Sequence, residues 1–263
     1  MSRSPLTSQQ LAEFEQTGVV RLPGFLPKEN VAAMADVVWM DLRRRYGVER
    51  DRRDTWLLEP RSPRGWQALI RSGAFSPLAT PELVEIGDAF LGHGAWTRPK
   101  RWGQPLVTFP SGDWDVPHAS WHIDLPAPDS LDHLSVLRIF AFLEPVEPRG
   151  GGTAYVAGSH RAVVDRAREA GRDGRLNSHH MRSVLKAEEP WLADLLTAGG
   201  GDRVERFMRR WGEMRGYPVR VEEMTGEPGD IILMHPAMIH VGTPNALDRP
   251  RMMIVETFWR TGA

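Results

Sequence analysis

The first third of the chain shows apolar positions at helical spacing. Thr7 and Gln10 have the spacing of a capping box, which predicts a helix that ends at Gly18. A second helix is predicted from Pro27, because apolar residues recur every three or four positions beyond it. The segment 80–82, Thr-Pro-Glu, has the cap, proline and acid expected where a third helix begins.

After residue 95 the pattern changes to short apolar runs between turns, which is typical of strands. The glycines at 150–152 predict a turn, so we expect the runs on either side of it to pair as a hairpin. The main predicted strands are Leu106–Phe109, Ser135–Leu143, Thr153–Val156, Val219–Val221, Ile231–Met234 and Arg251–Phe258.

Helices followed by short strands predict one α+β domain over residues 1–263, with a mainly β core built as a sandwich or barrel. We expect a helical N-terminal part at about 1–95 and the β core at about 96–260. A charged, helical insertion at about 161–215 interrupts the strands. It is either a lid over a binding site or a solvent-exposed decoration, and we test the prediction that it covers the mouth of the barrel.

Composition narrows the classes of function. The 33 basic and 34 acidic side chains leave a net charge of -1, so a nucleic-acid partner is not expected. The absence of cysteine excludes disulfides, zinc–thiolate sites and iron–sulfur clusters. No apolar run reaches the length of a membrane span, and the first ten residues lack the apolar core of a signal peptide. We therefore expect a cytoplasmic enzyme without membrane contact; the oligomeric state cannot be read from the sequence.

A possible metal site stands out in the run Trp121–Pro126. On a strand, residues two apart point to the same side, so His122 and Asp124 can approach one point. A lone His-x-Asp is usually a surface pair, but the segment 231–245 offers a third ligand in His240. Two histidines and one carboxylate form the facial triad that binds Fe(II) and leaves coordination positions open.

An open Fe(II) site needs a co-substrate that supplies electrons to activate O2, and 2-oxoglutarate can do this. Its far carboxylate requires a cation, for which the planar fork of arginine is suited. Arg251 begins the strand that follows His240, and an antiparallel return across the turn would bring it near the metal. Arg249 is the competitor, although it lies in the turn before Pro250. Otherwise, Arg251 would be an ordinary surface ion pair.

At this point nearly the whole chain resembles the phytanoyl-CoA dioxygenase-like family of Fe(II)/2-oxoglutarate-dependent oxygenases. Each motif that carries the resemblance is modest, but four in the right order are specific. The resemblance implies a double-stranded β-helix, a jelly-roll or cupin-like barrel with iron at one mouth. The four matching segments are Leu6–Leu26, His122-Ile123-Asp124, Gly150–His160 and His240–Arg251.

The resemblance also implies secondary contacts to the co-substrate. A position where family members often have tryptophan falls on Phe140, which is expected to make an apolar contact. Members often have serine where this chain has Gly242. Thr243 is a substitute for that hydroxyl, although strand alternation would turn it the other way. Arg138 is one of several cations that could meet an anionic substrate, although charges beside strands usually face water.

The leading hypothesis is a non-haem Fe(II)- and 2-oxoglutarate-dependent dioxygenase that uses O2 to hydroxylate a C–H bond of a small molecule. His122, Asp124 and His240 would form the catalytic metal centre, and Arg251, Phe140 and Thr243 would contact the co-substrate. One alternative is a metallohydrolase with zinc in the same ligands. Another is a non-catalytic metal-binding module on the same barrel. The hydrolase leaves Arg251 without a role, and an intact triad counts against the non-catalytic module.

Overall fold

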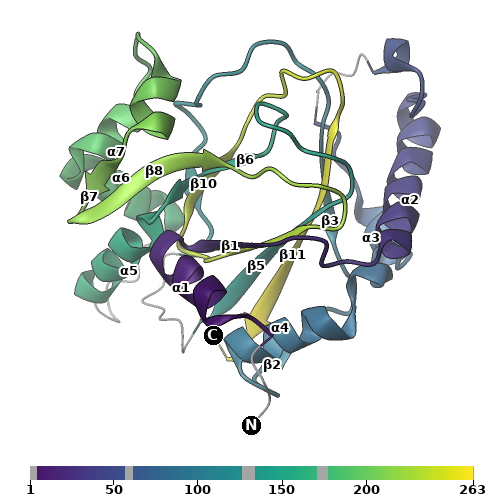
Figure 1. The fold of residues 1–263 in the computed structure, drawn as a ribbon, viewed down its shortest axis with the longest axis horizontal. Coiled ribbons are helices and arrows are strands. Elements are labelled where there is room, and N and C mark those ends of the chain that lie inside the picture. The colour runs from purple at the N-terminus through teal and green to yellow at the C-terminus, as the bar shows by residue number, and fades with distance from the viewer. Residues whose placement is uncertain (1–4, 57–61, 126–133, 171–176, 263) are drawn as a thin grey trace.

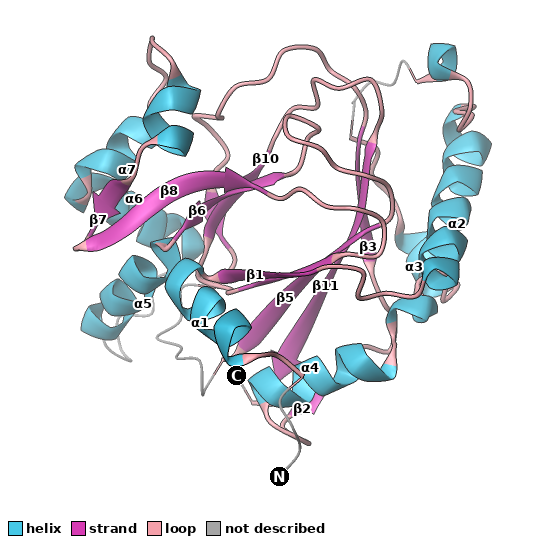
Figure 2. Cartoon of the chain, in the orientation of Figure 1, coloured by secondary structure: helices cyan, strands magenta, loops and turns pink. Residues whose placement is uncertain are grey.

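The computed structural model describes residues 5–56, 62–125, 134–170 and 177–262, in which two antiparallel sheets face each other between groups of helices (Figure 1, Figure 2). The six-stranded sheet contains β1 (Val19–Leu22), β9 (Ile231–Met234), β5 (Val136–Phe142) and β11 (Arg251–Arg260), with β2 (Trp96–Thr97) and β3 (Gln104–Thr108) both paired to β11. The five-stranded sheet has the order β4 (His122–Ile123), β10 (Ile239–Gly242), β6 (Thr153–Ala157), β8 (Tyr217–Glu223) and β7 (Gly212–Met214).

Strands from β3 to β6, and again from β8 to β11, alternate between the two sheets. The predicted hairpin of β5 and β6 is therefore wrong. β5 pairs with β9 and β11, whereas β6 pairs with β8 and β10 in the opposite sheet. The physical reason is burial on both faces of β5, where every residue except Arg138 is buried, so that it occupies a central position with a neighbour on each edge.

The N-terminal helices cover the outer face of the six-stranded sheet (Figure 1). The predicted helix starts are confirmed: Thr7 and Gln10 form a capping box, and the Thr80 hydroxyl accepts a hydrogen bond from the Leu83 amide. Gly18 ends the first helix in a left-handed conformation. These elements are α1 (Ser8–Thr17), α2 (Lys28–Tyr46), α3 (Gln67–Arg71) and α4 (Pro81–Leu91), with short 3₁₀ turns at Arg53–Thr55 and Ser76–Leu78.

The insertion lies against the outer face of the five-stranded sheet, on the opposite side of the molecule from α2 and α3 (Figure 2). It contains α5 (Ser159–Ala170), α6 (Ser178–Glu188), α7 (Pro190–Leu195) and a π-helical turn (Glu205–Arg209). Its apolar side chains pack on Ile123, Val156 and Ile239, which point away from the barrel interior. The prediction that it covers the barrel mouth is therefore wrong for the described helices; residues 171–176 lie outside the described part.

A third apolar cluster fills the space between the two sheets. Phe140 and Met253 enter it from the six-stranded sheet, and Tyr155 enters it from the five-stranded sheet. Alternation along the strands thus sorts the side chains into an interior layer and two outer layers. No described helix combines the length and the apolar character that crossing a membrane requires.

Candidate metal centre

The local fold of β4 turns His122 and Asp124 to one side. Trp121 and Ile123 are buried in the cluster beneath the insertion, so the residues between and after them face the other way. Asp124 lies one position beyond the end of this two-residue strand. The alternation predicted from the sequence therefore operates even on a very short strand.

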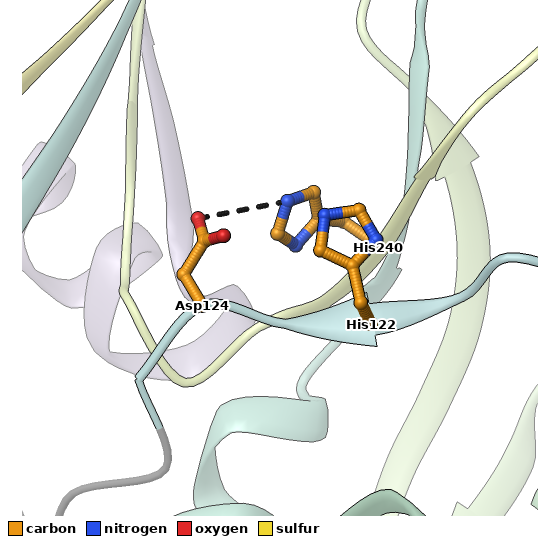
Figure 3. A group of neighbouring side chains, drawn as sticks. All are labelled: His122, Asp124 and His240. Atoms are coloured by element: carbon orange, nitrogen blue, oxygen red, sulfur yellow. Dashed lines mark ion pairs between the residues drawn. The ribbon is translucent and has the colours of Figure 1, made fainter. Parts of the chain in front are cut away.

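β10 brings the second histidine. It runs antiparallel beside β4, and His240 is the cross-strand partner of His122. The two imidazole rings lie side by side with centroids 4.2 Å apart, and Asp124 faces them (Figure 3). His240 Nε2 lies 3.6 Å from Asp124 Oδ2, and one ligand atom from each of the three residues falls within 4.8 Å of the others. The three residues singled out in the sequence therefore come together.

The hydrogen bonds of both imidazoles favour metal binding. His122 Nδ1 lies 3.0 Å from the Ser120 carbonyl, and His240 Nδ1 lies 3.1 Å from the Met238 carbonyl. A carbonyl can only accept, so Nδ1 carries the proton in both rings and Nε2 keeps its lone pair. Burial lowers the pKa of His240 to about 4, against the opposing effect of Asp124. The ring is thus neutral at pH 7, as a ligand must be.

Arg251 is a buried cation on the inner face of β11. It is 7% exposed, and its Nη2 donates to the hydroxyl of its cross-strand partner Thr108 at 2.7 Å. Its Nε has no hydrogen-bond acceptor, and no ion pair joins it to a carboxylate among the described residues. Burial lowers the pKa of Arg251 to about 10, partly offset by the charge of Glu223. It therefore stays charged at neutral pH and lacks a close counter-ion.

A cleft of about 690 Å³ connects Arg251 to the strand of the metal histidine. Its walls include Gly242 and Thr243 at the end of β10 and Ser120 just before β4. The predicted route to this arrangement is wrong, since β10 and β11 belong to opposite sheets and do not form a hairpin. Arg251 approaches from across the barrel instead.

Arg249, the competing cation, has other partners. Its side chain is 47% exposed and lies 3.6 Å from Glu147 Oε1 and 3.9 Å from Asp248 Oδ1. An exposed arginine in ordinary ion pairs has its charge screened by water and offers little to a buried ligand. The geometry favours Arg251 over Arg249.

Phe140 and Thr243, the two predicted secondary contacts to the co-substrate, have different surroundings. Phe140 points into the barrel interior from β5, so an apolar contact with a co-substrate there stays a prediction. The Thr243 hydroxyl donates to the Gly152 carbonyl at 2.7 Å and lies 3.4 Å from Glu223 Oε1. These partners engage the hydroxyl, but Thr243 also lines the cleft that contains Arg251, so its contact with the co-substrate stays a prediction.

Arg138 is the residue that sequence reasoning undervalued. We expected a charge beside a strand to face water, but Arg138 lies inside the barrel, and its Nε is 2.9 Å from Asp124 Oδ2. Its Nη1 donates to the hydroxyl of the cross-strand residue Thr257 at 2.8 Å. The available signal was its position two residues before Phe140, which places both side chains on one face of β5.

Comparisons with known proteins agree with this geometry. The family model for phytanoyl-CoA dioxygenase (PhyH) matches residues 14–253. L-proline trans-4-hydroxylase from Streptomyces griseoviridis is 25% identical over 247 residues, which cover 90% of this chain and 82% of that protein.

Two solved structures show a similar fold. HygX from Streptomyces hygroscopicus, solved with nickel and 2-oxoglutarate bound, is 19% identical; the match covers 98% of this chain and 88% of that chain with a TM-score of 0.55. EctD from S. alaskensis with bound Fe is 19% identical, with coverages of 99% and 79% and a TM-score of 0.57. The expected fold class, a jelly-roll barrel with added helices, is confirmed. Because the family model spans most of the sequence, the chain belongs to the phytanoyl-CoA dioxygenase family.

Proposed function

We propose that this chain is a non-haem Fe(II)- and 2-oxoglutarate-dependent dioxygenase that hydroxylates a C–H bond of a small molecule. Membership of a dioxygenase family supports the reaction class. The observation that carries the proposal for this chain is the pairing of two features. One ligand atom from each of His122, Asp124 and His240 lies within 4.8 Å of the others. A cleft leads from the end of β10, the strand of His240, to Arg251, which is buried and has no close counter-ion among the described residues.

The donor set fits Fe(II). His122 and His240 would each offer a neutral Nε2, and Asp124 would offer a carboxylate oxygen, which together form the facial triad. Three protein ligands leave positions for a bidentate co-substrate and for O2. When bound, the metal supplies the redox chemistry that couples cleavage of 2-oxoglutarate to oxidation of the substrate.

The remaining residues bind and orient. Arg251 would hold the far carboxylate of 2-oxoglutarate through its unused Nε–H and a second N–H of the fork. Thr108 keeps the guanidinium in place, and Phe140 would exclude water from the inner side. The balanced reaction converts substrate, O2 and 2-oxoglutarate into hydroxylated substrate, CO2 and succinate.

The alternatives explain less of the site. A zinc hydrolase would use the same three ligands to activate water, but it would leave Arg251 buried without a purpose. A non-catalytic module would not need two imidazoles and a carboxylate aimed at one point. Proline hydroxylation by a relative supports a small-molecule substrate without naming it. The cytoplasmic location and the lack of a nucleic-acid partner stay predictions.

Anaerobic titration of 2-oxoglutarate into the Fe(II)-loaded protein tests the proposal. Chelation by the co-substrate should produce a visible metal-to-ligand absorption band that saturates, and admission of O2 should then release succinate. A protein that binds Fe(II) but gives neither the band nor succinate would contradict the proposed function.

A further inference from the structure

Arg138 lies beside a proposed metal ligand and is held there from two sides. Its Nη1 donates to Thr257 on β11, and its guanidinium carbon is 5.8 Å from the centre of the Phe140 ring. The Nε atom is only 2.9 Å from Asp124 Oδ2, yet no hydrogen bond of good geometry forms between them. Arg138 therefore has a buried donor that its near neighbour does not satisfy.

The charges around Arg138 change when a metal is bound. Asp124 is its one ion-pair partner among the described residues. A divalent cation on Asp124 would offset that carboxylate and leave Arg138 with only the more distant charge of Glu256, although its side chain is only 22% exposed. A half-buried cation without a close counter-ion is unfavourable, and its planar fork matches a carboxylate well. The loaded site thus favours a further anion at Arg138.

We propose that Arg138 recognises a carboxylate of the substrate, so that the enzyme acts on small carboxylic acids. This inference rests on the proposed function and adds a substrate class to it. The far carboxylate of 2-oxoglutarate already has a cation in Arg251. Arg251 lies six residues before Thr257 on β11, and the two arginines have different hydroxyl partners: Thr108 for Arg251 and Thr257 for Arg138. Because Arg138 adjoins a metal ligand, the acid group would sit close to the metal.

The test uses acetate as the probe and acetamide as its neutral analogue. Wild-type protein is loaded with Mn(II) and saturating 2-oxoglutarate, and ¹³C relaxation of the carbonyl carbon of each probe reports its proximity to the paramagnetic ion. We expect acetate to be relaxed strongly and acetamide weakly. Arg138→Gln should weaken acetate binding by roughly tenfold or more, because a charge-assisted pair is lost.

Matched variants separate a binding role from other roles. Arg101→Gln removes the same charge from an exposed position and should leave acetate binding unchanged. Thr257→Val removes the acceptor that orients Arg138 and should weaken acetate binding about threefold while keeping the charge. The absorption band of the Fe(II) protein with 2-oxoglutarate should have the same midpoint in Arg138→Gln as in wild type.

Three results would overturn the inference. In the first, acetate and acetamide are relaxed equally in the wild-type protein. In the second, acetate still binds to Arg138→Gln and Thr257→Val with wild-type affinity. In the third, Arg138→Gln loses affinity for Fe(II) or 2-oxoglutarate instead of acetate. The last result would make Arg138 a support for Asp124 or for the co-substrate. A wild-type protein without the absorption band counts against the proposed function, whereas a normal band without an acetate effect counts against Arg138 alone.

Discussion

Two pairs of histidines lie close together in this fold, and only one of them has the surroundings of a metal centre. His122 and His240 have ring centroids 4.2 Å apart and share Asp124 as a neighbour. His160 and His235 have centroids 5.0 Å apart, and no described carboxylate completes a ligand group with them. The difference shows that two adjacent imidazoles do not by themselves make a metal site. A carboxylate beside them and ring nitrogens that point at a common open position are also needed.

The second pair is used for packing. His160 Nε2 lies 3.0 Å from the Glu15 carbonyl, and His235 Nδ1 accepts a hydrogen bond from the Ala237 amide. The His235 ring also packs on Phe14, with centroids 6.1 Å apart. Burial lowers the pKa of His160 to about 4 and that of His235 well below its ordinary value. Burial thus keeps both histidines of the second pair neutral, as it does His240, but only the first pair faces an open site.

Substitutions at the proposed metal centre and in the second histidine pair should give the largest difference in Fe(II) binding. Asp124→Ala or His240→Ala should reduce Fe(II) affinity by more than the roughly 10–100-fold typical of residues that only support ligands. His235→Gln should leave Fe(II) affinity within about threefold of wild type. Anaerobic calorimetry with Fe(II) checks both. Full iron occupancy in Asp124→Ala would remove the distinction between the pairs.

Co-substrate binding should depend on the cation near the first pair. Arg251→Ala should weaken 2-oxoglutarate binding by roughly a hundredfold or more, because truncating a buried ionic partner typically costs about 3–5 kcal/mol. Arg251→Lys should remain impaired, since an ammonium cannot reproduce the fork. Arg249→Ala is the matched control and should have a mild effect. Titration of the Fe(II) protein measures all three; a reversed order would exchange the roles of the two arginines.

Acid should destabilise the folded protein through His160 of the second pair. In the unfolded chain His160 binds a proton below about pH 6.5, whereas in the folded protein its pKa is about 4, so stability falls as the pH drops between these values. Between pH 7 and pH 5 this histidine alone should lower the free energy of unfolding by about 2 kcal/mol. Urea unfolding of His160→Gln should show a correspondingly flatter dependence on pH. An unchanged slope would mean that burial of His160 does not control acid stability.

A small gain in 2-oxoglutarate affinity is expected from a hydroxyl added to β10, the strand of His240. Gly242 lies two residues after His240 on the same face of β10, and a Cβ placed on it would meet no atom within 4 Å. Gly242→Ser should supply a hydroxyl to the co-substrate and tighten 2-oxoglutarate binding about three- to tenfold, the effect of one hydrogen bond. Gly242→Ala is the control for added bulk. Equal affinities for both variants would show that the hydroxyl finds no partner.

Local features were predictable because they depend on neighbours in the sequence. The capping box of Thr7 and Gln10 requires only four consecutive residues, and the shared face of His122 and Asp124 follows from alternation along one strand. His240 was identified by residue type and order along the chain. The three proposed metal ligands could therefore be named before any strand partner was known.

Tertiary structure decided which elements meet. The pattern of apolar residues shows which faces are buried but not which strand lies alongside, so β5 and β6 were expected to pair although they lie in opposite sheets. The same limit concealed the position of the insertion on the outer face of the five-stranded sheet. It also concealed Arg138, whose contacts with Asp124 and Thr257 join residues 14 and 119 positions away. Such contacts arise because distant segments bury their apolar faces together, which no local pattern specifies.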